Sequence, residues 1–279
     1  MNRGGDTAGN AKQQYLDAMG ILRWQRRASG LPENAQPAGD EVDVSLPPDN
    51  HEGERSQEHA RAAPPRKSHD SPAVIRTEPE NDSAGKGSPQ IAGLDWDTLR
   101  SRVSECTACE LHTSRTQTVF GTGNRNADWL VIGEAPGADE DAQGEPFVGR
   151  AGQLLNAMLL ACGLEREQVY IANILKCRPP DNRDPRPGEV ASCEPYLMRQ
   201  IELIQPKLIL AVGRIAAQNL LQCDTPIGKL RGSVHTFRDT GIPLVATYHP
   251  AYLLRSPAEK RKAWQDLQLA MQIVNEASS

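Results

Sequence analysis

The chain has 279 residues, a formal net charge of -5 and a hydrophobic content of 38%. This acidic balance excludes the basic signature of a protein that binds DNA tightly without regard to sequence, so contacts with nucleic acid must come from local patches. The sequence has no apolar run of about 18 residues and no N-terminal apolar signal core. These absences predict a cytoplasmic protein that does not enter a membrane.

The first third of the sequence differs in composition from the rest. Apolar side chains recur every three to four residues within residues 12–27, which predicts an amphipathic helix in an N-terminal part spanning residues 1–27. Residues 28–92 are crowded with Pro, Gly, Ser, Glu and Asp, which predicts a disordered linker. Residues 93–279 are long enough for one α/β domain. The N-terminal helix has three open roles: it binds a partner, docks on this domain or frays.

Helical and strand patterns alternate through the domain. Apolar runs predict four main strands and one short edge strand, at residues 129–132, 169–174, 207–212 and 243–248, with the edge strand at 233–237. Helical periodicity predicts helices at residues 94–103, 151–162, 187–204, 213–221 and 258–274. Such alternation is typical of a mostly parallel sheet with helices on both faces.

Each informative polar cluster comes directly after a predicted strand. The clusters are Glu134, Glu140 and Phe147 after the first strand, Asn173 and Asn182 after the second, and His249 after the last. The carboxyl ends of parallel strands meet at one edge of a sheet, where such folds place ligands. We therefore expect these side chains to converge on one pocket.

The residue types in these loops suit one kind of reaction. An aromatic face stacks on a planar base, and an Asn amide pairs with the carbonyl and imide edge of a pyrimidine. A His can donate a hydrogen bond to an oxyanion that develops on a leaving group, and a carboxylate can position water or support a cationic sugar. Together they predict cleavage of an N-glycosidic bond.

Four of the six cysteines form a set. Cys106 and Cys109 make a CxxC, and Cys177 and Cys193 are separated by fifteen residues. Four thiolates fit either a structural zinc ion or an iron–sulfur cluster, and the lack of a second CxxC favours the cluster. A third interpretation is that all six thiols are free and buried. The remaining two, Cys162 and Cys223, are expected to pack in the core.

Three stretches and the cysteine pattern together resemble a known family. The stretches read GEAPGADED…GEPFVGRAG, NILKCRPPDNRDP and HPAYLLR, and the similarity covers residues 94–274. They resemble family 4 uracil-DNA glycosylases, the iron–sulfur members of their superfamily. The resemblance implies removal of uracil from DNA in base excision repair. It also implies a three-layer α/β sandwich with a central four-stranded parallel sheet, and a [4Fe–4S] cluster on Cys106, Cys109, Cys177 and Cys193.

The resemblance also implies residue roles. The residues with catalytic roles are Glu134, His249 and Asn182. Those expected to contact the substrate are Phe147, Asn173 and Glu140. The HPAYLLR stretch resembles a segment that enters the minor groove, with one of two leucines as a wedge. Residues expected at the DNA are Arg183, Leu253, Leu254 and Arg255.

The sequence departs from other uracil glycosylases at two places. Ala135 stands where the best-known members carry an Asp general base, so catalysis is expected to depend on Glu134 and His249. Relatives that bond covalently to DNA have an arginine-rich loop with a nucleophilic His near residues 229–235. That stretch is short here. We therefore expect turnover and a structural role for His235.

Two other functional classes remain open from the sequence. One is an iron–sulfur module that binds DNA or transfers electrons without releasing a base. The other is a zinc-stabilised nucleotide-binding protein. For the leading interpretation we expect a monomer, associated with the nucleoid, that acts on uracil-containing DNA. A replication or repair protein is the expected partner of the N-terminal helix.

Overall fold

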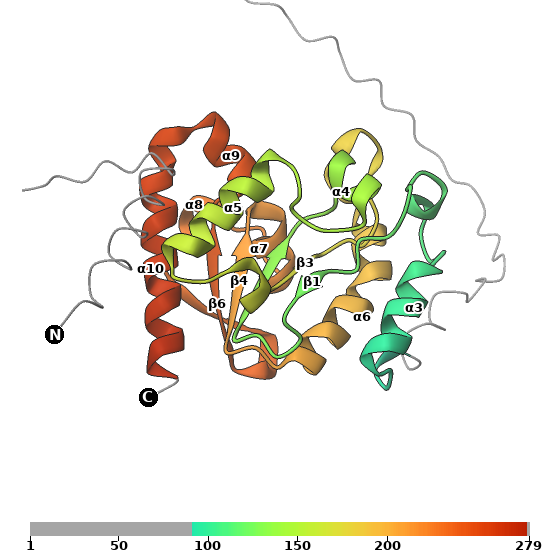
Figure 1. Ribbon diagram of the computed structural model, residues 1–279, viewed down its shortest axis with the longest axis horizontal. Coiled ribbons are helices and arrows are strands. Elements are labelled where there is room, and N and C mark those ends of the chain that lie inside the picture. Colours follow the sequence, from blue (N-terminus) through green and yellow to red (C-terminus); the bar gives the residue numbers. More distant parts are fainter. Residues whose placement is uncertain (1–90, 278–279) are drawn as a thin grey trace, which may run out of the picture. The chain divides into compact units, whose positions relative to one another are not determined.

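The computed structural model describes residues 91–277 (Figure 1). Residues 1–90 lie outside the described residues. They include the predicted N-terminal helix and all but the last two residues of the predicted linker. Ile91 is buried against Leu99 and Val103, so the packed part begins two residues before the expected boundary at residue 93. Within the described part, no helix is long and apolar enough to cross a membrane.

The centre of the fold is a six-stranded sheet with the order β1-β3-β2-β4-β6-β5. The strands are β1 (Thr122–Gly123), β2 (Trp129–Gly133), β3 (Tyr170–Asn173), β4 (Leu208–Val212), β5 (Val234–Phe237) and β6 (Ile242–Thr247). The four inner strands are parallel, and β1 and β5 pair antiparallel at the two edges. The expected four-stranded sheet is therefore corrected to six strands.

The edge strand β1 lies in a stretch that has no strand pattern. It has two residues and pairs with β3 through Thr122–Ile171 and Gly123–Tyr170. Gly123 has a φ of +116°, and a Cβ there would lie 1.9 Å from the Val169 carbonyl oxygen. A glycine is thus required for this backbone to approach β3.

Helices flank the sheet (Figure 1). The α-helices are α3 (Trp96–Ser104), α4 (Ala138–Gln143), α5 (Arg150–Ala161), α6 (Pro187–Ile204), α7 (Arg214–Leu221), α8 (Ile227–Leu230), α9 (Pro250–Arg255) and α10 (Lys260–Glu276). Short 3-10 turns are η1 (Glu110–Thr113), η2 (Arg166–Gln168), η3 (Pro180–Asn182), η4 (Arg238–Thr240) and η5 (Pro257–Glu259). The Asp95 carboxylate caps α3 by accepting from Thr98 N at 2.8 Å.

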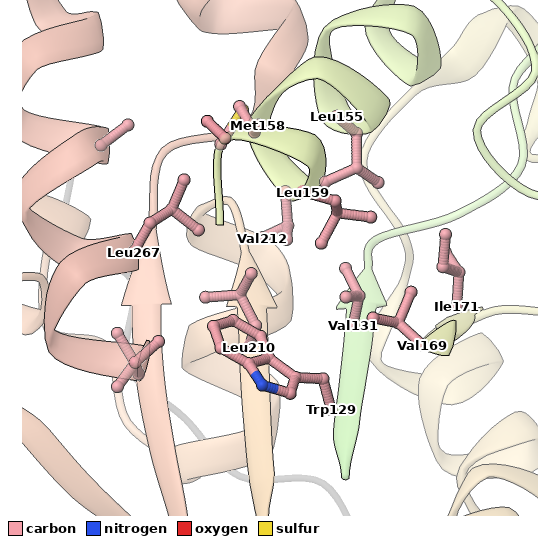
Figure 2. Packing of buried hydrophobic residues seen from close by; sticks show 14 of the residues in the cluster. Trp129, Val131, Leu155, Met158, Leu159, Val169, Ile171, Leu210, Val212 and Leu267 are labelled. Atoms are coloured by element: carbon pink, nitrogen blue, oxygen red, sulfur yellow. The ribbon is translucent and has the colours of Figure 1, made fainter. Parts of the chain in front are cut away.

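Alternate residues of each inner strand face opposite sides of the sheet, and each side has its own core. On one side α5 and α10 pack on the strands, and Figure 2 shows Leu155 and Leu159 of α5 with Val131 and Leu210 of the sheet. On the other side α6 and α7 cover β2 and β4; that cluster includes Leu130, Ile132, Leu197, Ile201, Ile209 and Leu220. The predicted α/β arrangement with helices on both faces is confirmed.

A third cluster joins α3 to α6. Leu99 and Val103 of α3 pack with Leu175 and Tyr196, and all are buried. Cys177 and Cys193 belong to the same cluster, and Cys106 and Cys109 pack against it. The segment from α3 to η1 therefore packs on the cysteine-bearing region, and Trp96 of α3 also packs on Tyr170 of β3 at a ring-centroid distance of 5.2 Å.

Candidate active site

A cavity of about 460 Å³ opens at the carboxyl edge of the parallel strands. It brings together eight of the residues singled out from the sequence: Glu134, Glu140, Phe147, Asn173, Asn182, Arg183, His249 and Arg255. These residues come from segments after β2, β3 and β6, which are neighbours or near neighbours in the sheet. The topology thus gathers side chains that lie more than 100 positions apart in the chain.

The ring of Phe147 forms one wall of this cavity. It is 6% exposed and stacks with the His249 imidazole at a centroid distance of 5.6 Å and an interplanar angle of 29°. The Phe147 backbone has a φ of +54°, a left-handed conformation that is costly for a bulky residue. Such a conformation persists only where its surroundings impose it.

Two charged side chains hold the Phe147 segment. The Glu140 carboxylate accepts from Gly137 N at 3.1 Å, Val148 N at 2.9 Å and Gly149 N at 3.2 Å. Arg166 donates to the carbonyl oxygens of Pro146 at 2.5 Å and Phe147 at 3.4 Å. Glu140, which the sequence assigned to substrate contact, therefore also braces the loop. The role of Arg166 was missed, because nothing in the local sequence distinguishes it.

Asn173 is the last residue of β3 and is 2% exposed. Among the described residues, its Oδ1 atom is buried without a hydrogen-bond partner. A Cβ at Gly133 would lie 2.5 Å from this oxygen and 2.6 Å from the Phe147 ring atom Cζ. Glycine at the end of β2 therefore leaves the amide and the ring side by side. A buried, unpaired carbonyl oxygen is costly and suits a ligand that brings a donor.

His249 caps the N-terminus of α9. Its Nδ1 accepts from Ala251 N at 3.2 Å, so the neutral ring carries its proton on Nε2. Burial lowers the pKa of His249 to about 4, and the charge of Arg255 lowers it further in the same direction. The imidazole is therefore neutral at physiological pH and offers an Nε2–H donor.

Glu134 follows β2 and is half-buried at the cavity. Burial raises its pKa to about 7, the charge of Asp184 contributes in the same direction, and the charge of Arg214 opposes the shift. Asp184 and Arg214 form an ion pair at 2.7 Å. A carboxyl group with a pKa near neutrality can exchange protons during a reaction at physiological pH.

Asn182 and Arg183 line the cavity, but their side chains have partners within the protein. Asn182 Oδ1 accepts from Arg178 Nε at 2.8 Å. Arg183 donates two hydrogen bonds to the Glu189 carboxylate, at 2.9 and 2.5 Å, and one to the Asp184 carbonyl oxygen at 3.0 Å. The Arg183 guanidinium therefore braces the loop between η3 and α6. Its expected contact with DNA stays a prediction.

The two leucines of α9 have different environments. Leu253 is 1% exposed and belongs to the core between α5, α10 and the sheet, whereas Leu254 is 37% exposed. The expectation for Leu253 is therefore corrected, because a side chain held in the core does not reach a ligand. Leu254 is free to do so, and Arg255 lines the cavity beside it.

The four cysteines of the predicted metal set line one small cavity together with Arg115 and Lys176. Within residues 91–277, no three His, Cys, Asp or Glu side chains are close enough to hold a single metal ion. Four thiolates are a ligand set that suits a structural zinc ion or an iron–sulfur cluster. Two of the four cysteine sulfurs accept hydrogen bonds: Cys177 Sγ accepts from Arg115 Nη1 at 3.1 Å, and Cys193 Sγ accepts from Lys176 N at 3.2 Å.

Burial penalises a thiolate in this cavity. It raises the pKa of Cys193 to about 12 and also raises the pKa values of Cys177 and Cys109. Thiolates become stable there only with a cationic partner such as a metal group. The other two cysteines, Cys162 and Cys223, are half-buried against the two main core clusters, where the sequence predicts them.

Comparison with known proteins decides the family. Residues 120–268 match the model of the uracil DNA glycosylase superfamily. The type-4 uracil-DNA glycosylase of Archaeoglobus fulgidus is 48% identical over 167 residues, which are 58% of this chain and 84% of that protein. The Thermotoga maritima type-4 enzyme is 42% identical over 179 residues, 63% of this chain and 93% of that protein. The chain belongs to the type-4 uracil-DNA glycosylases.

A more distant relative shows how far the similarity extends. The type-5 uracil-DNA glycosylase of Pyrobaculum aerophilum is 31% identical over 148 residues, which are 47% of this chain and 64% of that protein. As a type-4 family member, the chain carries its cavity and all four clustered cysteines between residues 106 and 255. The resemblance inferred from the sequence is confirmed.

Proposed function

We propose that this protein removes uracil from DNA by hydrolysing the bond between the base and deoxyribose, leaving an abasic site for base excision repair. Membership of the type-4 family and the named relatives support this function. One structural observation carries it: the unpaired Asn173 Oδ1 lies next to the ring of Phe147 at the bottom of a polar cavity.

Asn173 and Phe147 together match uracil. The base stacks on the Phe147 ring, and its N3–H donates to Asn173 Oδ1 while its O4 accepts from the Asn173 amide. Cytosine has an acceptor at N3 and an amino group at position 4, so both hydrogen bonds would be lost. A buried acceptor left unpaired costs about 1–3 kcal/mol, which discriminates against the wrong base.

His249 and Glu134 have complementary roles in bond breaking. As the bond from the sugar C1′ to the base N1 breaks, its electron pair stays with the base, and the Nε2–H of His249 donates to the O2 oxygen where negative charge accumulates. The Glu134 carboxylate stabilises the oxocarbenium-like sugar and orients water for addition at C1′. The water proton passes to that carboxylate. Asn182 positions the loop around η3, where its Oδ1 accepts from Arg178 Nε.

We also propose that the four clustered cysteines hold a [4Fe–4S] cluster. Cys106 and Cys109 lie between α3 and η1, Cys177 follows β3, and Cys193 lies in α6. When bound, the cluster supplies iron–thiolate bonds that join these segments covalently. The segment after β3 also contains Asn173, so the cysteine ligands support the side of the cavity that reads the base.

Leu254 and Arg255 are the proposed DNA contacts. Leu254 is exposed and lies on α9, the helix whose N-cap is His249. An apolar side chain inserted between base steps compensates for the unstacking that a flipped base requires. We further propose that the enzyme acts as a monomer on nucleoid DNA in the cytoplasm, and that residues 1–27 bind a replication or repair protein.

The test is an assay on three end-labelled oligonucleotides that differ only at one position, which holds uracil, thymine or cytosine. Alkaline treatment converts abasic sites to strand breaks, and we expect breaks with uracil alone. Asn173→Asp replaces the amide donor with a second acceptor and is expected to weaken the preference for uracil. Binding of the uracil strand without breaks, by folded protein containing iron, would instead indicate a binding module.

A further inference from the structure

Lys176 is a buried cation that the proposed reaction does not use. Its side chain is 1% exposed, and Nζ donates to the Asn173 carbonyl oxygen at 3.0 Å and to Gln200 Oε1 at 2.6 Å. Both acceptors are neutral. Among residues 91–277, no carboxylate forms an ion pair with Lys176. A buried ammonium without a counter-charge is strongly unfavourable.

The groups that can supply this counter-charge are the cysteine sulfurs. Lys176 lines the cavity that the four cysteines share, and it precedes Cys177 in the chain. Its backbone N–H donates to Cys193 Sγ at 3.2 Å. A group bound by four thiolates carries net negative charge, so it would complete the electrostatic environment of the ammonium.

The Lys176 ammonium also contacts Asn173, the residue proposed to recognise the base. The Lys176 ammonium fixes the carbonyl of Asn173, whose side chain presents the unpaired Oδ1 to the cavity. Gln200, the second acceptor, is fully buried and donates to the Phe120 carbonyl oxygen at 3.0 Å. The ammonium is therefore held in one position between two buried partners.

We propose that Lys176 is a positioning residue with two roles. Its ammonium is the counter-charge of the cysteine-bound group, and its hydrogen bond to the Asn173 carbonyl oxygen orients Asn173 for uracil. This inference rests on the proposed function and on the cysteine-bound cluster. It predicts that loss of the lysine charge weakens both the metal group and the recognition of the base. A residue with only a packing role would affect neither when replaced by an apolar side chain of similar length.

The first test compares Lys176→Met with the unaltered holoprotein. Three quantities are measured: iron and acid-labile sulfide per chain, the rate of iron release to a ferrous chelator, and the dissociation constant for free uracil. Lys176→Met is expected to accelerate iron release and weaken uracil binding, each by about 10- to 100-fold, as for other residues that support metal ligands. Lys229→Met, at an exposed lysine of α8, is the matched control for iron content and release.

The second test keeps the lysine and adds a negative charge beside it. Gln200→Glu is isosteric and places a carboxylate at the position that lies 2.6 Å from Nζ. If the ammonium serves the cysteine-bound group, the new carboxylate competes for it, and iron release accelerates. This variant decides the question if Lys176→Met does not fold.

The results separate this inference from the proposed function. Unchanged iron release in both variants, or slower release in Gln200→Glu, would overturn the role of Lys176. If the unaltered protein fails to release uracil while Lys176→Met still loses iron faster, the proposed function falls and the counter-charge role stands. Unchanged affinity for free uracil in Lys176→Met would exclude a role of Lys176 in orienting Asn173.

Discussion

Burial shifts the pKa values of two ionisable side chains of the cavity in opposite directions. The pKa of Glu134 rises to about 7, and that of His249 falls to about 4. Since the reaction needs ionised Glu134 and neutral His249, kcat/KM should rise with pH through about 7 and should show no His249 limb between pH 5 and 7. A pH–rate profile on a uracil oligonucleotide measures this.

The same shift affects folding. The folded state holds the Glu134 proton more tightly than the unfolded chain does, because the pKa rises from its ordinary value of 4.5 to about 7. This contribution to the free energy of unfolding is full below about pH 4.5 and is lost as the pH rises through 7.

The pH dependence of activity should disappear with the carboxyl group. Glu134→Gln should give a lower kcat/KM that does not change with pH through 7. A profile that still rises through pH 7 would assign the limb to another group.

Removing the imidazole tests its role as a donor. His249→Ala should lower kcat by about 10²–10³-fold, because a donor to a developing oxyanion contributes about 2.7–4 kcal/mol to transition-state stabilisation. His235→Ala is the matched control, since His235 hydrogen-bonds to the Leu230 carbonyl oxygen outside the cavity. Single-turnover kinetics on both variants provide the measurement. Equal rates would exclude His249 from the chemical step.

At the scale of elements, the end of β2 decides the shape of the cavity. A methyl group at Gly133 would lie within 2.6 Å of both Asn173 Oδ1 and the Phe147 ring. Gly133→Ala should therefore lower kcat/KM by about 10²-fold, because the amide and ring must move from their productive positions. Gly228→Ala, where a Cβ meets nothing within 4 Å, is the control. Wild-type activity in Gly133→Ala would show that the pocket tolerates the shift.

Element prediction succeeded where the pattern was long. The apolar runs predict β2, β3, β4 and β6 to within one or two residues, and helical periodicity predicts α6 with its observed bounds. The misses are short elements: β1 has two residues, α8 has four, and α4 and α9 have six each. Such segments are held by tertiary contacts such as those of Glu140, which leave no periodic signal in the sequence.

At the scale of the whole molecule, the site should be independent of the N-terminal third. The cysteine and cavity residues lie between positions 106 and 255, and the superfamily match spans residues 120–268. Deletion of residues 1–90 should therefore leave kcat/KM on a short oligonucleotide unchanged within error. The same assay on the full chain is the reference. An inactive, folded truncation would show that residues 1–90 contribute to the site.

The sequence predicted which residues gather at the cavity but not how they are held. Position after a strand was enough to place Glu134, Asn173 and His249 at one edge of the sheet. The contacts of Arg166 with Pro146 and of Lys176 with Gln200 join residues that are 20 or more positions apart, so no local pattern indicates them. Nor did the sequence distinguish Leu253 from Leu254, since only the packing of α9 buries one of the two.

The left-handed backbone of Phe147 has a consequence for the protein's evolution. A glycine there would relieve a backbone cost of about 1–3 kcal/mol, but it would also remove a ring that is 6% exposed and belongs to the core, a loss of about 3–5 kcal/mol. Selection for heat resistance alone should therefore retain Phe147. Variants at this position should lose thermal stability together with the surface on which a base would stack.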